Sequence, residues 1–346
     1  MGSSRWLFAL VVAFFVRVAF AHDVLVEAGA AITSPSADNP RVGNASVAVA
    51  GTFEATDEWA VFATAQYTRD LATSTAEFTV TGSNVLLFGL GASWAPSENL
   101  VTMLDLTGSP PTTQLNTTTV TVNGRSADAV VNAQTWSLGG LWTGAWMSAG
   151  ESNFESMVDV ALGLTRFDVF QRMQVGSSGR AQLLRAACNT AVYQKVPLCR
   201  LLTGASTPLL QGRLGGGYTA TLFGSTDVSL SATYYLYDKD PDEVGFFSLV
   251  ALGRAELGNG VPVLPLQVSL KPSIAHRFGP LTLRVAYQLG LYQNGNGSNH
   301  VFGGKLTWKT SRSLRLYLSL TGQFDTTQGE VVNPGGNGVL GALVSW

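Results

Sequence analysis

The chain has 346 residues, of which 46% are hydrophobic and 13% are charged, with 38 glycines and a formal net charge of −2. Such sparse charge is unusual for the surface of a soluble protein, and the weakly negative balance argues against a nucleic-acid partner. After the N-terminal segment, no stretch reaches the roughly 18 uninterrupted apolar residues of a membrane-spanning helix. A closed β-barrel also satisfies every backbone hydrogen bond in lipid, so the composition favours one.

The N-terminal segment has the pattern of a cleaved signal peptide. Arg5 supplies positive charge, Trp6–Val16 form an apolar run, and Ala19-Phe20-Ala21 match the small-x-small pattern that signal peptidase accepts. A retained anchor is the competing interpretation. We predict an exported protein with a signal peptide over residues 1–21 and a single barrel domain over residues 22–346.

Candidate strands follow along the rest of the chain. The first, Val24–Thr33, alternates only weakly, and Val244–Leu257 is ambiguous between a helix and an extra hairpin. Clear period-two alternation marks Leu281–Leu291 and Ser313–Thr321, where leucine holds every even position of the second stretch. Successive side chains of a strand point to opposite faces, so each stretch has one apolar and one polar face. The last copy, Gly338–Trp346, ends in an aromatic residue in phase with its strand.

Short polar links alternate with longer connections between the candidate strands. Turn chemistry marks short links at residues 56–58, 96–99, 149–153, 224–226, 277–280 and 310–312. The longer connections are residues 34–43, 70–83, 108–131, 173–209, 239–262, 293–298 and 326–335. Outer-membrane barrels have short turns at one rim and long loops at the other. Six turns and seven loops require fourteen strands, with both termini at the short-turn rim, and twelve or sixteen strands are the alternatives.

Together these features resemble the Gram-negative outer-membrane β-barrel superfamily of porin-like channels. The leader, the alternating strands, the two loop lengths and the terminal Val344-Ser345-Trp346 carry the resemblance, although members end more often in Phe than in Trp. The resemblance implies an all-β, antiparallel, up-and-down transmembrane barrel in the outer membrane, in contact with outer-membrane lipid and lipopolysaccharide. It implies that the barrel-assembly machinery reads the C-terminal strand through Trp346. The predicted mature N-terminus is too short for the internal hatch of the fourteen-stranded long-chain fatty-acid channels.

Tryptophans near predicted strand ends fit an aromatic girdle at the headgroup level of a membrane. These residues are Trp59, Trp94, Trp142, Trp146, Trp308 and Trp346. The alternative is that they are ordinary core tryptophans of a soluble β-protein.

If the apolar face meets lipid, the other face lines the interior and carries the charges. The predicted basic residues of this lining are Arg213, Lys271, Arg277, Arg284, Lys305 and Arg315. The predicted acidic residues are Glu54, Asp105, Glu155 and Asp159. A basic wall facing an acidic one would produce a transverse field that favours some polar solutes. Small residues at many other inward positions would leave space, whereas charges that pair across the interior would plug it.

The two cysteines, Cys188 and Cys199, stand in a stretch without strand alternation, and in an exported chain an even count indicates a disulfide. Two free thiols are the alternative. No histidine is near them in the sequence, so we predict no metal site. The spacing of the three histidines indicates no catalytic arrangement, so we predict neither enzymatic activity nor a cofactor.

We therefore predict a porin-like channel for passive diffusion of small solutes, without catalysis. One alternative is a structural or ligand-binding barrel with a plugged lumen that acts through its extracellular loops. Another is a channel for hydrophobic compounds that leave laterally through the wall, because fold does not decide function.

Overall fold

The computed structural model describes residues 23–33, 42–70, 73–74, 78–80, 84–122, 125–149, 155–175, 182, 186, 188, 202, 204–239, 266–295, 297–327 and 330–345. The predicted signal peptide, the ambiguous stretch 244–257 and Trp346 lie outside the described residues. Among the residues that are described, no helix is both long and apolar enough to cross a membrane.

Fourteen long strands dominate the structure. They are β1 (Asp23–Thr33), β2 (Val42–Glu54), β3 (Trp59–Asp70), β6 (Asn84–Ser97), β7 (Leu100–Val122), β8 (Arg125–Ala149), β9 (Glu155–Val175), β10 (Ala205–Leu222), β11 (Thr226–Tyr237), β12 (Leu266–Phe278), β13 (Leu281–Tyr292), β14 (Ser298–Lys309), β15 (Leu314–Thr327) and β16 (Glu330–Ser345). The described part of the chain also contains the short strands β4 (Thr73–Ser74) and β5 (Phe78–Val80) and the 3₁₀ turn η2 (Gln293–Gly295).

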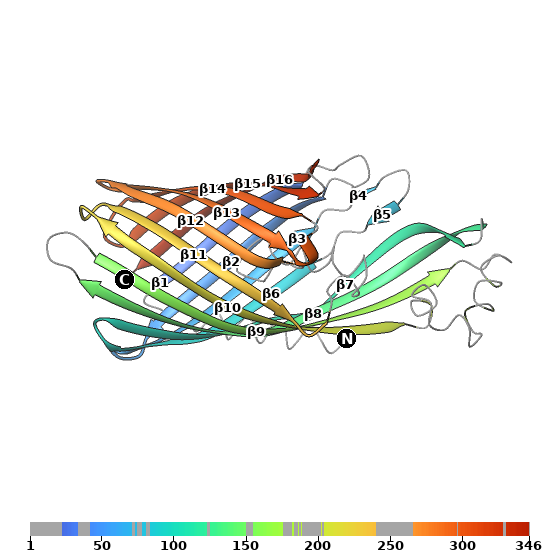
Figure 1. Ribbon diagram of the computed structural model, residues 1–346, viewed down its shortest axis with the longest axis horizontal. Helices are drawn as coiled ribbons and strands as arrows, with labels where there is room; N and C mark the ends of the chain where they lie inside the picture. The colour runs from blue at the N-terminus through green and yellow to red at the C-terminus, as the bar shows by residue number, and fades with distance from the viewer. Residues whose placement is uncertain are drawn as a thin grey trace.

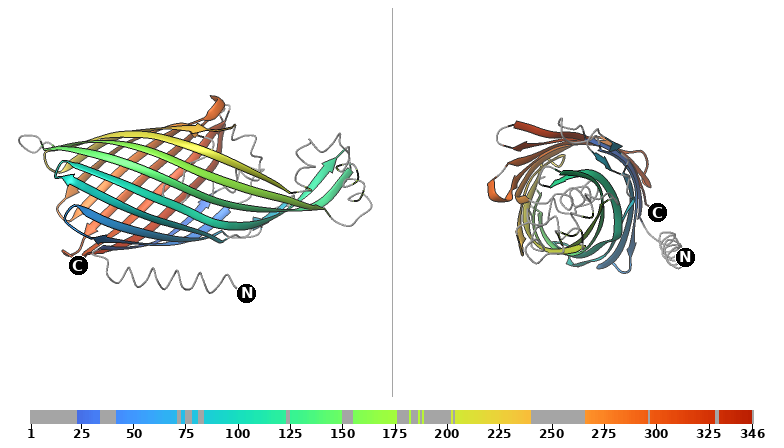
Figure 2. Two further views of the ribbon diagram at one scale, coloured as in Figure 1. Left: turned by 90° about the horizontal axis from the view of Figure 1, so that it is seen from below. Right: turned by 90° about the vertical axis from the view of Figure 1, so that its right-hand side faces the viewer.

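The strands close into one antiparallel barrel, as the views along and across its axis show (Figures 1 and 2). Each long strand pairs with its neighbours in sequence order, and the first strand pairs with the last, from Asp23 opposite Ser345 to Thr33 opposite Gly335. Closure leaves no long strand with an unpaired edge, which is the condition for a sheet to span lipid. The predicted all-β barrel of about fourteen strands is confirmed, including the weak first strand.

The predicted short links all join neighbouring strands at one rim of the barrel, and β1 begins and β16 ends there. The prediction that every connection at the other rim is long is wrong in two places. Strands β7 and β8 stay paired as far as Val122 opposite Arg125, and β15 and β16 as far as Thr327 opposite Glu330. Much of the end of β7, which lies inside the predicted connection 108–131, is threonine and valine. These residues favour strands, but here they do not show the apolar alternation of a lipid-facing strand.

Strands β7 to β10 have 23, 25, 21 and 18 residues, and the first three extend well past the rest of the barrel at the long-loop rim (Figure 1). The β7–β8 pairing shifts register between Ser109 and Thr112, at the pair Pro110-Pro111. Proline has no N–H to donate to the ladder, so the irregularity falls where these residues force it. Beyond it, β7 also pairs with β5, Phe78 lying opposite Thr118.

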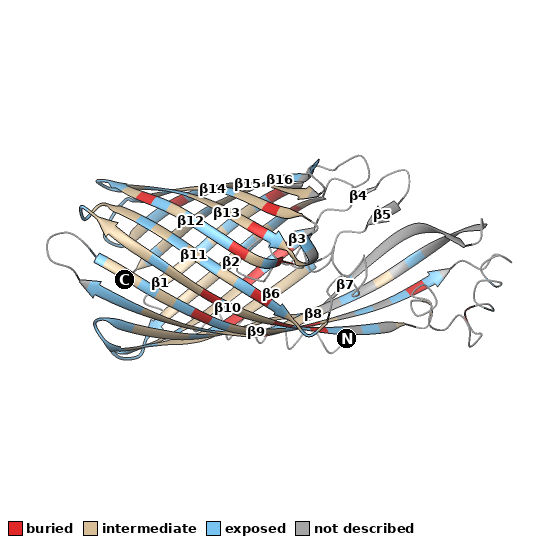
Figure 3. Cartoon of the chain, viewed as in Figure 1, coloured by how far each residue is buried: buried red, intermediate tan, exposed pale blue. Residues whose placement is uncertain are grey.

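Buried positions are scattered among exposed and intermediate ones along the strands (Figure 3), and the two faces of the wall differ in exposure. On β15, the side chain of Leu320 is 57% exposed, whereas Tyr317, on the other face, is 9% exposed. The exposed face carries large apolar side chains around the whole barrel. An apolar surface this extensive matches the lipid-facing band of a transmembrane barrel.

The exposure of the described tryptophans agrees with the predicted aromatic girdle. Trp59, Trp94, Trp142, Trp146 and Trp308 are all exposed, and all of them except Trp142, which is seven residues from Ala149, lie within a few residues of a short-turn end of their strand. Trp59 stacks on Trp94 with 5.7 Å between ring centroids. These rings place one membrane interface near the short-turn rim.

Part of the interior towards the long-loop rim is tightly filled. Phe167 on β9, Leu209 on β10 and Leu266 on β12 have almost no exposed surface. Gln211, equally buried, donates a 3.0 Å hydrogen bond to the Tyr237 hydroxyl, which in turn donates one of 2.7 Å to the carbonyl of Leu266. On the side of β9 to β12, the barrel therefore has a packed core instead of an open lining.

The lipid-facing assignment predicts a depth-dependent cost for arginine on β15. Leu316 pairs with Trp308, at girdle level, and Leu320 pairs with Gly304, four residues further along. At a strand tilt of about 40°, four residues span about 10 Å of depth, so Leu320 lies near the middle of an apolar band about 25 Å tall. We expect Leu320→Arg to lower the free energy of unfolding by about 2–4 kcal/mol and Leu316→Arg by about 0–1 kcal/mol. Denaturant titration of the refolded barrel in lipid vesicles measures both, and equal costs would contradict the assigned depth.

Candidate functional site

Basic side chains gather inside one sector of the barrel. On four consecutive strands, β12 to β15, the interior face carries Lys271, Arg277, Arg284, Lys305 and Arg315. The face is identified by the pairings: Arg284 lies opposite Lys305, and Lys305 opposite Ser319, two residues from the buried Tyr317. The structure thus brings five of the sequence-predicted residues onto one patch of wall.

The predicted acidic residues lie on other strands. Glu54 is on β2, Asp105 on β7 and Asp159 on β9, each in phase with the interior face. In the ring of fourteen long strands, β7 is seven steps from β14 in either direction, so Asp105 and Lys305 stand on opposite walls. Arg213 on β10 faces inward among the acidic strands, so the separation of charge is incomplete. That these residues line a path for solutes stays a prediction.

Glu27 on β1 is an interior carboxylate that the sequence reading missed. The Tyr317 hydroxyl donates a hydrogen bond to Glu27 Oε1 although the residues stand on β15 and β1, with β16 between them. Gly341 makes this reach possible, because a Cβ at that position of β16 would overlap the Tyr317 ring. The contact is a staple across the seam where the barrel closes. The alternation of Val26 and Ala28 on either side of Glu27 was the available signal.

Lys305 completes this cluster from β14. Its Nζ lies 3.7 Å from the centroid of the Tyr317 ring, a cation–π contact. Lys305 interacts electrostatically with two charged groups, the Glu27 carboxylate and the Arg284 guanidinium. A single polar layer therefore runs from β13 through β14 and β15 to β1, near the short-turn rim.

Two pairs of like charge lie directly across from one another in this sector. Arg284 on β13 is opposite Lys305 on β14, and Lys309 on β14 is opposite Arg315 on β15. Like charges directly opposite on one face of an antiparallel pair are destabilising. Arg277, by contrast, has a carboxylate nearby, with 3.5 Å between its guanidinium and Asp227.

Several interior glycines do not leave the open space that the sequence suggested. A Cβ at Gly91 would overlap the Phe62 ring, and one at Gly217 would overlap the Asp159 carboxylate. Each glycine makes room for a large inward side chain on the neighbouring strand, as Gly341 does for Tyr317. Small residues here allow close packing of neighbours, so they are not a measure of pore width.

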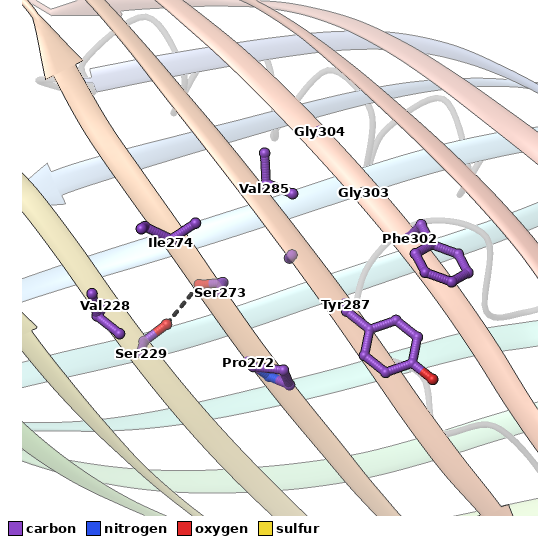
Figure 4. Close-up of a pocket in the computed structure, with 11 residues that line it drawn as sticks. Val228, Ser229, Pro272, Ser273, Ile274, Val285, Tyr287, Phe302, Gly303 and Gly304 are labelled. Atoms are coloured by element: carbon purple, nitrogen blue, oxygen red, sulfur yellow. Dashed lines mark hydrogen bonds between the residues drawn. The ribbon is translucent and has the colours of Figure 1, made fainter.

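A pocket of about 640 Å³ lies in the wall over β11 to β14 (Figure 4). Val228, Ile274, Val285 and Phe302 contribute from the lipid-facing side, while Ser273 and Gly303 belong to the interior face. The lining is almost wholly apolar, and its few polar groups include the Ser229 and Ser273 hydroxyls, which bond to each other at 2.6 Å. Its position and lining suit an apolar ligand.

The pocket coincides with an interruption of the β12–β13 ladder. Pairing holds at Leu270 opposite Leu289 and at Ser273 opposite Ala286, but between them Lys271 and Pro272 have no partners on β13. Proline is rare in central strands because it cannot donate to the ladder. Pro272 lines the pocket, so the missing ladder pairs and the apolar hollow occur at the same residue.

Neither the histidines nor the cysteines form a reactive cluster among the residues that the structure describes. His276 Nδ1 lies 2.8 Å from the Thr226 hydroxyl, and His300 Nδ1 lies 2.7 Å from the Tyr287 hydroxyl. No group of three metal-ligating side chains occurs within the described part of the chain. Cys188 is buried, and Cys199 lies outside the described residues, so the disulfide stays a prediction.

No protein-family model matches the chain, and a search of curated proteins finds no match either. Solved structures do resemble it. The Ralstonia pickettii toluene transporter TbuX is 10% identical with a TM-score of 0.61, and the match covers 94% of this chain and 90% of that one. A Pseudomonas aeruginosa FadL homologue has a TM-score of 0.61 at 9% identity, with the same coverage. The translocator domain of the Neisseria meningitidis autotransporter NalP has a TM-score of 0.50 at 8% identity, over 99% of this chain and 98% of that one.

The fold is that of the Gram-negative outer-membrane β-barrels. Identities this low establish the fold alone. Structures of similar fold include both transporters and an autotransporter domain. An argument about the function of this barrel must therefore be based on its own site residues and not on its fold.

The seam staple predicts an asymmetry between two glycines of the barrel. We expect Gly341→Ala to lower the free energy of unfolding by about 1–3 kcal/mol, because the new methyl displaces the Tyr317 ring and breaks its bond to Glu27. Gly304→Ala is the matched control, since a Cβ there meets nothing within 4 Å. Denaturant midpoints of the refolded variants decide the matter, and equal stability of the two would contradict the staple.

Proposed function

We propose that this protein is an outer-membrane channel for small hydrophobic compounds. The observation that carries the proposal is the apolar pocket in the wall at Pro272, where the β12–β13 ladder is interrupted. A hydrophobic compound moving between the interior and the membrane needs an apolar passage through an otherwise hydrogen-bonded wall, and the apolar pocket beside the interrupted ladder supports a passage at this place. Lateral exit would then occur between β12 and β13.

The fold neighbours add support of a general kind. TbuX is a toluene transporter, and CymD, also similar in fold with a TM-score of 0.55, is a monoaromatic hydrocarbon channel. The pocket is large enough for one such small molecule. These neighbours show that barrels of similar fold can transport hydrocarbons, but their ligands do not identify the compound that this chain would carry.

Free diffusion of small polar solutes, our first expectation from the sequence, has less support. The interior near β9 to β12 is filled by Phe167, Leu209 and Leu266. Many inward glycines lie beneath neighbouring side chains. A wide aqueous pore would need these positions to be open, whereas passage of an apolar compound through the wall does not.

Uptake of radiolabelled toluene by Gram-negative cells that produce the protein tests the proposal. We expect faster uptake than in cells without it, and loss of that gain in Gly304→Phe. Gly304 lines the pocket and a Cβ there meets nothing within 4 Å, so a phenyl ring at this position would take up part of the pocket.

Gly212→Phe is the matched control, because Gly212 is on β10, away from the pocket, and a Cβ there makes only ordinary contacts. Equal amounts of folded protein in the outer membrane, judged by heat-modifiable mobility, make the rates comparable. Wild-type uptake no faster than background would refute the channel function. Full uptake by Gly304→Phe would refute the wall pocket as the route.

A further inference from the structure

We propose that the interior of β13 to β15 holds a binding site for a small oxyanion, formed by Arg284 and Lys305, with Lys309 and Arg315 four residues nearer the short-turn rim. The site goes beyond the proposed passage of hydrophobic compounds and does not depend on it. Its ligand is a compact anion with several acceptor oxygens, of which inorganic phosphate is the simplest.

The geometry that points to an anion is the arrangement of the two like-charged pairs. Arg284 opposite Lys305 and Lys309 opposite Arg315 set four cations on one face of three adjacent strands. Directly opposed residues have Cβ atoms only about 5 Å apart, so their charges repel unless an anion lies between them. A phosphate that bridges both members of a pair converts this repulsion into charge-assisted hydrogen bonds.

The surrounding carboxylates offset the charge of the four cations only in part. Glu27 compensates Lys305, whose Nζ lies over the Tyr317 ring, and also accepts a hydrogen bond from the Tyr317 hydroxyl. Asp227, on β11, lies beside Arg277 and also accepts a 2.8 Å hydrogen bond from the Thr221 hydroxyl. Within the described residues, Arg284 and Arg315 have neither a hydrogen bond nor an ion pair to a carboxylate.

The position also suits an anion arriving through water. Arg284 and Arg315 are exposed to solvent in the interior, close to the short-turn rim. Arginine and lysine rows of this kind give anion-selective pores their preference. A locally unfavourable arrangement in an otherwise consistent sheet is also a common mark of a binding site.

Isothermal titration of inorganic phosphate into the refolded full-length barrel in detergent, at fixed ionic strength, tests the site directly. We expect saturable binding to the wild type and at least about tenfold weaker binding to Arg284→Gln/Lys305→Gln, because the double variant loses two charge-assisted hydrogen bonds to the anion. The charge-retaining swap Arg284→Lys/Lys305→Arg should keep most of the affinity, and heat-modifiable mobility identifies the variants that fold.

Arg277→Gln is the matched control, because it removes an interior arginine that already has Asp227 beside it. Its phosphate affinity should equal that of the wild type. In phosphate-free buffer, Arg284→Gln should raise the denaturant midpoint, since it relieves repulsion, while Arg277→Gln should not.

Three results would overturn the proposal. They are an absence of saturable phosphate binding to the wild type, equal loss of affinity in Arg277→Gln and the double variant, and a lower denaturant midpoint for Arg284→Gln in phosphate-free buffer. None of these results bears on toluene uptake, so failure here leaves the hydrophobic channel to its own test.

Discussion

The pairing of β1 with β16 is the constraint on which the rest of the structure depends. Lipid offers no partners to backbone N–H and C=O groups, so a sheet in a membrane must close. Here the first and last strands meet over eleven residue pairs, from Asp23 to Thr33. The Tyr317 side chain reinforces the seam from inside by crossing β16 above Gly341 to reach Glu27. The Tyr317–Glu27 hydrogen bond therefore connects β15 to β1 across β16 inside the barrel. The charged side chain of Lys305 packs against the same contact.

Closure also fixes what the interior can contain. With fourteen long strands the barrel is intermediate between small barrels filled by their own side chains and porins with wide channels. In this chain the space is divided. A packed core around Leu209 and Leu266 occupies one sector, and a layer of charge between Arg284 and Glu27 occupies another. Glycines beneath aromatic and acidic side chains allow that packing. Whether an inward glycine leaves open space in the interior therefore depends on the side chain opposite it on the next strand. The sequence does not identify that residue until the strand register is known.

The sequence predicted what alternation and punctuation encode, and missed what depends on pairing. Leucine at every second position of β15 determines which face meets lipid, and the polar links locate the short-turn rim. The interior phase of Arg284 and Lys305 follows from the same alternation. Their direct opposition depends on register across a turn, and the Tyr317–Glu27 contact joins residues 290 positions apart. The extension of β7 past Pro110 was misread as loop, because its threonines are strand formers that lack the apolar period of a lipid-facing strand. Pro272 was visible in the sequence, but its consequence appears only when the missing partners on β13 are known.

The departures from regular barrel construction concentrate on a few adjacent strands. Apart from register shifts such as the one at Pro110-Pro111 and the threonine-rich end of β7, propensity, alternation and pairing agree over the other strands, as they do in sequences that specify one structure. On β12 a proline interrupts the ladder, and on β13 to β15 like charges face each other. The proline in the ladder and the opposed like charges each lower the stability of the sheet. Pro272 lines an apolar hollow on the lipid-facing side, whereas Arg284 and Lys305 lie on the interior face, so the two irregularities are on opposite faces of the same wall. A sheet that is only a scaffold has no need of either, and their proximity makes this sector, more than the protruding β7–β8 hairpin, the place where the activity of the barrel should be sought.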